Sequence, residues 1–142
     1  MNLALMVLAA ICVGCGADRS ATFFAEDGVS ITVELEHAHS TLAEYTRKLS
    51  LARGNRIIAV SDLSRDTGGY AAANLSRCSP DLYLLDSYGE FLLIDARVGT
   101  IREGRCQANP AYLGIFDGAG TKPWRFFSAQ ESEERELRMS GA

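Results

Sequence analysis

The sequence from residue 29 to residue 36 reads VSITVELE, and this stretch decides the fold class. Apolar side chains at Val29, Ile31, Val33 and Leu35 alternate with polar ones, which is the period-two pattern of a strand with one buried face. The pattern therefore predicts a β-strand that covers a hydrophobic core on one side and faces water on the other.

The next segment predicts a β-hairpin over residues 43–61. Gly54-Asn55 lies in its middle, and both residue types accept the positive φ that a tight hairpin turn requires. The preceding residues 42–52 also fit the spacing of a helix face, and Arg47 interrupts their apolar strand face. The turn chemistry and the apolar return segment favour the hairpin.

Strand-sized apolar runs continue along the chain, separated by turn residues at intervals of about 8–12 residues. The charged tail after Ala129 has the composition of either a short helix or a frayed end. The whole predicts an all-β domain, an antiparallel meander that forms a sandwich or an open barrel. The further strands are expected at 22–24, 70–77, 82–85, 90–95, 98–102, 112–116 and 124–127.

Length and charge exclude several classes of protein. The chain has 142 residues, which is enough for one domain, and its hydrophobic fraction of 47% is too high for a disordered protein. Its net charge is −4, so it has no basic excess with which to neutralise phosphates, and we expect no nucleic-acid partner.

Residues 1–17 contain no charged side chain, and Leu3 to Val13 form an unbroken apolar run. This run is shorter than the roughly 20 residues of a transmembrane helix and suits the apolar region of a secretory signal. The alternative interpretation is a buried N-terminal helix or strand. Small residues around a cysteine follow the run directly, in the order Val13-Gly14-Cys15-Gly16.

This arrangement resembles the lipobox of bacterial lipoproteins, in which the signal is cut before a diacylated cysteine. The resemblance implies that Cys15 is lipidated and anchors the chain to a membrane, facing the periplasm of the bacterial envelope. Aspartate, which signals inner-membrane retention in enteric bacteria, is absent from positions 16 and 17, and this favours the outer membrane over the inner. The expected organisation is a signal peptide at 1–14, a tether at 15–21, a β-domain at 22–128 and a charged tail at 129–142.

Two cysteines, Cys78 and Cys106, then belong to the folded part of the chain. In an exported domain such a pair most simply forms one disulfide. The closed loop of about 28 residues would stabilise the fold by roughly 3–4 kcal/mol. We expect it to be a structural bond, because no metal-binding spacing surrounds either cysteine.

Few residues are candidates for a chemical site. If the strand predicted over residues 29–36 continues, His37 and His39 lie on one face and could bind Zn²⁺ or Cu²⁺. The alternative interpretation is that they are ordinary polar residues at the end of the strand. The triplet Asp66-Thr67-Gly68 spells an aspartic-protease motif but has no second copy, so a polar turn explains it better. No catalytic residue and no cofactor are predicted.

Binding is the function that these exclusions leave. The chain has twelve aromatic residues, and Tyr70 and Tyr88 stand in expected turns, where they could contact a partner. We expect a non-enzymatic envelope lipoprotein that binds a protein, for instance as an immunity protein or inhibitor against a periplasmic toxin or hydrolase. A structural or accessory lipoprotein of an envelope assembly and an uncharacterised envelope hydrolase are the alternatives.

Overall fold

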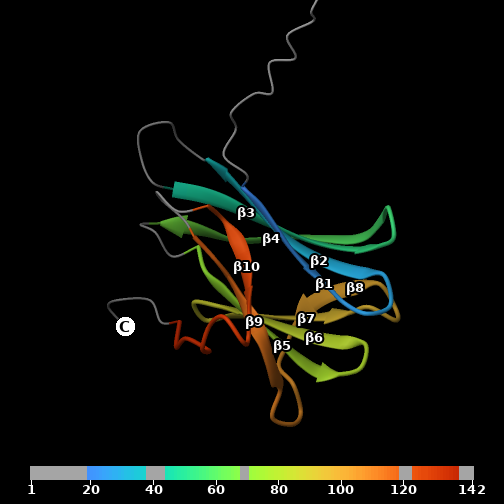
Figure 1. The fold of residues 1–142 in the computed structure, drawn as a ribbon. Coiled ribbons are helices and arrows are strands. Elements are labelled where there is room, and N and C mark those ends of the chain that lie inside the picture. The colour runs from blue at the N-terminus through green and yellow to red at the C-terminus, as the bar shows by residue number, and fades with distance from the viewer. Residues whose placement is uncertain (1–18, 38–43, 68–70, 119–122, 138–142) are drawn as a thin grey trace, which may run out of the picture.

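Two antiparallel sheets pack face to face in the computed structural model of the chain (Figure 1). The structure describes residues 19–37, 44–67, 71–118 and 123–137. These ranges contain strands and turns but no helix, so the all-β prediction is confirmed, in the form of a sandwich and not of an open barrel. None of these segments has the helical length and apolar character of a membrane span.

The first sheet is a meander in the order β1-β2-β3-β4. The alternating stretch of the sequence forms β2, and Gly54, with a φ of 56°, turns the predicted hairpin. Asp66 and Thr67 continue the last strand opposite Tyr45 and Glu44, so the prediction of a polar turn at these two residues was wrong. The strands are β1 (Ser20–Phe24), β2 (Val29–His37), β3 (Glu44–Arg53) and β4 (Arg56–Thr67).

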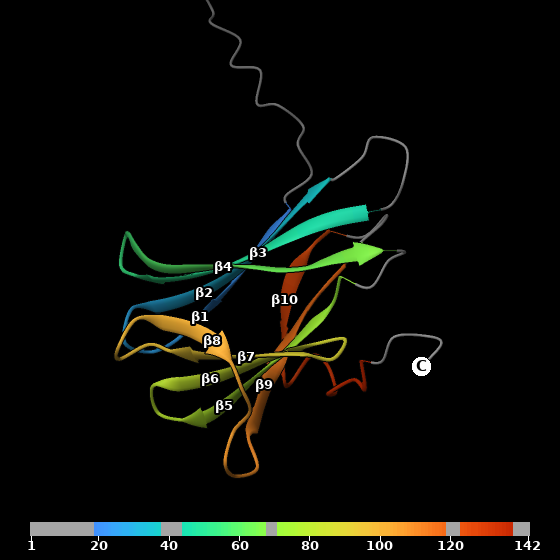
Figure 2. The same ribbon diagram turned by 180° about the vertical axis from the view of Figure 1, so that it is seen from behind.

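The second sheet has the order β10-β9-β5-β6-β7-β8 and is not a simple meander. After four consecutive strands the chain crosses back and places β9 beside β5, in the manner of a Greek key (Figure 2). At the margins of the sandwich β1 lies next to β10, and β4 lies next to β8. The strands are β5 (Ala73–Ser79), β6 (Leu82–Ser87), β7 (Glu90–Asp95), β8 (Thr100–Glu103), β9 (Ala111–Asp117) and β10 (Arg125–Ser128).

The hydrophobic core lies between the two sheets and takes alternate residues from their strands. Trp124 joins the sheets by a polar contact as well, because its indole Nε1–H donates to the carbonyl oxygen of Val33 at 2.9 Å. The most completely buried core side chains are Ile31, Val33, Leu49, Leu51, Leu75, Leu85, Ile94 and Phe116.

A strap of three residues, Gly104 to Cys106, crosses the outer face of the second sheet. The Gly104 amide donates to the carbonyl of Phe91 at 3.0 Å, and a Cβ at this glycine would lie 2.7 Å from a methyl group of Leu93. The Arg105 guanidinium stacks over the Phe91 ring at 3.4 Å from its centroid. Leu84 and Leu93 point away from the inter-sheet core and are nevertheless buried.

The C-terminal tail covers the neighbouring part of the same face. After a turn at residues 129–131 it runs without regular structure to residue 137, so the helical alternative for the tail was wrong over the part that the structure describes. The Asn74 amide donates to the carbonyl of Arg135 at 2.7 Å, and the Arg135 guanidinium pairs with Asp117 at 2.7 Å. The tail is therefore docked on the sheet by side chains that the sheet presents outward.

Candidate functional site

The outer face of the first sheet is the candidate binding surface. Three cross-strand rows follow from the strand register, each taking one residue from β1, β2, β3 and β4 in turn. Small polar side chains fill the middle of the face, where the hydroxyl groups of Thr22 and Thr32 hydrogen-bond at 2.8 Å. The rows are Phe24–Ser30–Ala52–Ile57, Thr22–Thr32–Ser50–Val60 and Ser20–Glu34–Lys48–Asp62.

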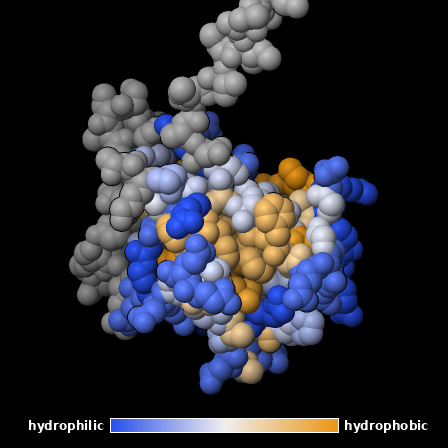
Figure 3. All heavy atoms as spheres, in the orientation of Figure 1, coloured by the Kyte–Doolittle hydropathy of each residue, from blue (hydrophilic) through white to orange (hydrophobic). Residues whose placement is uncertain are grey.

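Large apolar side chains stand at the two edges of this face. Phe24 on β1 is 77% exposed, and Ile57 and Val60 on β4 are 62% and 53% exposed. Figure 3 shows apolar surface over the β3–β4 hairpin and also in the middle of the view, where β1 passes β10. Ile57 and Val60 are close on one strand, and neighbouring exposed apolar side chains of this kind can mark a site that another molecule covers.

The third row gives the same face an acidic end. Glu34 lies opposite Lys48, which in turn lies opposite Asp62, and Glu36 follows on the same side of β2. Three carboxylates thus face one ammonium group, and all four side chains are exposed. A partner that covers this face would be attracted by its acidic end if the surface of the partner were basic.

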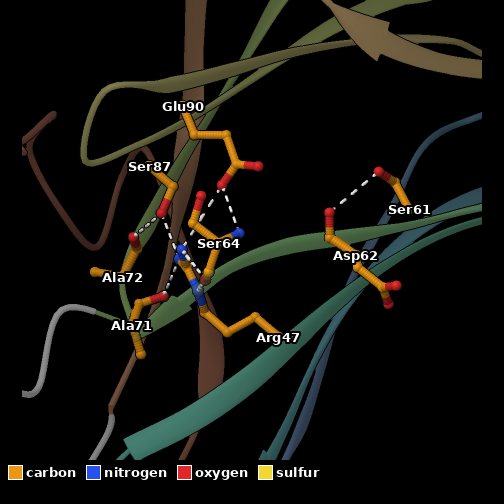
Figure 4. Close-up of polar contacts among 8 residues, drawn as sticks. All are labelled: Arg47, Ser61, Asp62, Ser64, Ala71, Ala72, Ser87 and Glu90. Atoms are coloured by element: carbon orange, nitrogen blue, oxygen red, sulfur yellow. Dashed lines mark hydrogen bonds and ion pairs between the residues drawn. The ribbon is translucent and has the colours of Figure 1, made fainter. Parts of the chain in front are cut away.

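A buried arginine holds the sheet behind this face in place (Figure 4). Arg47 on β3 points into the sandwich and is only 3% exposed. Its Nε and Nη2 donate to the carbonyl of Ser64 at 3.0 and 2.9 Å, and Nη1 donates to the carbonyl of Ala71 at 3.3 Å and to the hydroxyl of Ser87. Its charge faces Glu90 across 3.8 Å.

These contacts connect elements from both sheets at one end of the sandwich. The Ser87 hydroxyl extends the network, because it donates to the carbonyl of Ala72 at 2.9 Å. The Glu90 carboxylate accepts from the amide of Ser64 at 2.9 Å. Arg47 therefore has a structural partner for each of its three nitrogen atoms. Its contacts tie Ser64 near the end of β4 to Ala71, just before β5.

Comparison with protein-family models, curated proteins and solved structures gives no match. The function has to be inferred from the surfaces of the chain itself.

The predicted disulfide is present, since Cys78 and Cys106 are bonded with their Cα atoms 5.4 Å apart. It fastens the end of the strap to β5. Tyr88 lies in the two-residue turn between β6 and β7 and has a φ of 50°, which such turns require at both central positions. It lines an open depression together with Glu90, Arg105 and Ser64 of β4.

The other predicted site residues lie wholly or partly outside the described part of the chain. His37 ends β2 opposite Tyr45, but its side chain is not described, and His39, Tyr70 and Cys15 lie outside the described residues. The described side chains contain no group of three or more histidine, cysteine or acidic residues close enough to hold a metal ion.

Sequence reasoning missed the apolar edge on β4, although a signal for it exists. Residues 57–60 read IIAV, four apolar residues in succession, in a strand that buries only one face. Alternation places two of the four outside, and a bulge opposite Leu51 and Ala52 shifts the register so that Ile57 and Val60 are the exposed pair.

Proposed function

We propose that the chain is a non-enzymatic envelope lipoprotein whose sandwich binds a protein partner through the outer face of the first sheet. The observation that carries the proposal is the contrast between the two sheets. The strap and the tail cover the outside of the second sheet, whereas Phe24, Ile57 and Val60 stand exposed on the outside of the first. Burial of these side chains would favour association by about 25 cal/mol per Å² of apolar surface.

The partner that this face fits is a folded protein with an apolar patch beside basic side chains. Phe24 on β1 and Ile57 and Val60 on β4 would supply apolar contacts at the two edges of the face, and the acidic row would attract lysine or arginine. An inhibitor or immunity protein would use the face to occupy a periplasmic toxin or hydrolase, which is the function we favour.

The binding test uses the full chain as bait against an envelope extract of its own host. We expect one protein to be retained in a stoichiometric complex. The double variant Ile57→Glu and Val60→Glu should lose it, because two carboxylates would then have to be desolvated at the interface. The matched control is the double variant Gln107→Glu and Gln130→Glu, which adds two carboxylates at exposed positions outside the first sheet. Equal retention by the Ile57→Glu and Val60→Glu variant would overturn the proposed surface.

The kind of partner decides between the two binding functions. A retained hydrolase or toxin whose activity falls in proportion to bound chain supports the inhibitor function. Recovery of components of an envelope assembly alone would sink that function and favour an accessory lipoprotein.

The anchor is tested separately at Cys15. Replacing Cys15 by Ser removes the sulfur that would carry the diacyl group, so the variant should move from the membrane fraction to the soluble periplasmic fraction. Cell fractionation followed by immunodetection measures this, with Cys12→Ser as the control. A Cys15→Ser protein that stays with the membranes would refute the lipid anchor.

A further inference from the structure

A cleft of about 400 Å³ opens at the end of the sandwich that carries the β1–β2 and β3–β4 turns, where the Gly54 amide donates to the carbonyl of Gly28 at 2.9 Å. It lies where the β1–β2 turn, the end of β5 and the segment before β9 meet. In Figure 1 the β1–β2 turn and the β5–β6 turn appear on the same side of the molecule. Glu26 and Asp27 line it from the first turn, Arg77 and Tyr83 come from the second sheet, and Asn109 adds an amide. Its size is in the range of sites for small ligands.

Arg77 is the unusual group in this cleft. Its guanidinium lies over the Tyr83 ring, 5.7 Å from the centroid, and shares a hydrogen bond with the Tyr83 side chain. Its Nε is buried and has no hydrogen-bond partner, and among the described residues no carboxylate forms an ion pair with it. A guanidinium has five donors, and a buried donor without an acceptor is unfavourable. The Arg77 guanidinium thus lines the cleft as a cation that has no ion-pair partner among the described carboxylates.

Two carboxylates line the same cleft as this cation, and a third lies in the adjoining turn. Glu26 and Asp27 are exposed at the mouth, and Asp81 in the β5–β6 turn acts electrostatically on Tyr83 together with Asp27. The excess of acidic over basic groups in and beside the cleft repels an anion with several charges, such as phosphate. The acidic groups attract an ammonium group at the same time.

We propose that this cleft binds a small zwitterion, with its carboxylate on Arg77 and its ammonium group on Glu26 and Asp27. The carboxylate matches the planar donor fork of arginine, which binds such groups in a bidentate manner. The ammonium group neutralises the acidic mouth. Free amino acids and short peptides share this chemistry.

The test is an NMR titration of the full ¹⁵N-labelled chain with alanine, Ala-Ala and Ala-Ala-Ala at millimolar concentration. We expect saturable shifts confined to the cleft amides, around residues 26–27, 77–83 and 109–111. Tighter binding of alanine would identify a free amino acid as the natural ligand type, and tighter binding of the tripeptide a peptide. Absence of shifts with all three probes would overturn the proposal.

Charge controls then show whether both ends of the ligand are recognised. The N-acetylated and the C-amidated forms of the best probe each lack one charge and should bind about tenfold more weakly or worse, the loss expected when a charge-assisted contact is missing. If the N-acetylated form binds as well as the zwitterion, the cleft takes simple anions and the proposal is wrong.

Variants locate the two contacts. Arg77→Gln should weaken binding by about tenfold or more, and the double variant Glu26→Gln and Asp27→Asn should do the same without touching the core. Glu103→Gln, exposed on the edge strand β8, is the matched control and should bind as the unaltered chain does. Unchanged affinity in the double variant would overturn the assignment of the ammonium contact, even if Arg77→Gln failed to fold.

Discussion

Arg47 offers the sharpest test of how this sandwich is held together. Replacing it by alanine removes the donors for the carbonyls of Ser64 and Ala71 and for the hydroxyl of Ser87, all at buried or partly buried positions. It also removes the charge that faces Glu90. The variant keeps the exposed surface of the protein, so the effect should appear in stability and not in solubility.

The expected loss follows from these contacts. A hydrogen bond to a charged group contributes about 1.5–3 kcal/mol, and several such bonds to one arginine do not add in full. Truncation also relieves the desolvation of the guanidinium, and Glu90 can be rehydrated because 22% of its side chain is exposed. We therefore expect Arg47→Ala to lower the free energy of unfolding by about 3–5 kcal/mol, a large share of the roughly 5–15 kcal/mol of a typical domain.

Urea unfolding followed by tryptophan fluorescence measures this loss. The chain has one tryptophan, Trp124, which is 4% exposed and hydrogen-bonded to the opposite sheet, so its emission reports the separation of the sheets. With a slope near 2 kcal/mol/M the midpoint should fall by about 2 M.

Lys48→Ala is the matched control, because Lys48 is the next residue on β3 and points to solvent. It should change stability by about 0.5 kcal/mol or less. A loss of less than about 1 kcal/mol for Arg47→Ala would refute the reasoning, because the network would then contribute no more than an ordinary surface contact.

Three further perturbations test other parts of the fold. Replacing Cys78 and Cys106 by serine opens a loop spanning 28 residues and should lower stability by about 3–4 kcal/mol, and equal urea midpoints would show that the bond adds nothing. Burial raises the pKa of Asp86, against the opposing effect of Arg105 and with a contribution from Glu134, so the folded state keeps this proton to higher pH than the unfolded chain. The free energy of unfolding should then fall as the pH rises from the unfolded-state pKa of Asp86 to its folded-state pKa. Asp86→Asn should therefore be more stable than the unaltered chain at neutral pH. If this difference in stability does not shrink in acid, the reasoning is contradicted. Gly114→Ala would place a Cβ 2.1 Å from the carbonyl oxygen of Phe127 and should lower the free energy of unfolding by about 2–4 kcal/mol. The control is Gly54→Ala, where the added Cβ meets open space. Equal thermal midpoints for the two variants would count against this prediction.

The strands were predictable because their signals are local. Alternation in residues 29–35 fixes which face of β2 is buried, and Gly54-Asn55 fixes the hairpin that follows. The interruption at Arg47 was visible in the sequence, but its meaning was not. Its acceptors come from residues 17 to 40 positions further along the chain, and the sequence contains no sign that they converge.

The candidate surfaces were less predictable than the strands, because they depend on how distant segments of the chain are arranged in the two sheets. The return of β9 to the side of β5 sets where the strap and the tail lie, and hence which sheet keeps an open face. Sequence reasoning had chosen histidines and turn tyrosines because these residue types are chemically versatile. The structure instead exposes Ile57, Val60 and Phe24 on one face of the first sheet, and individually these look like ordinary strand residues.

The docked tail also sets a practical limit on where the chain can be cut or joined to another protein. Asn74 and Tyr112 on the second sheet bind the tail at Arg135 and Glu133, beyond the last strand. A fusion made at residue 128 would discard these contacts and present a bare sheet to the medium. Any ligand captured by such a fusion would report an artificial surface, so affinity tags belong after the final residue.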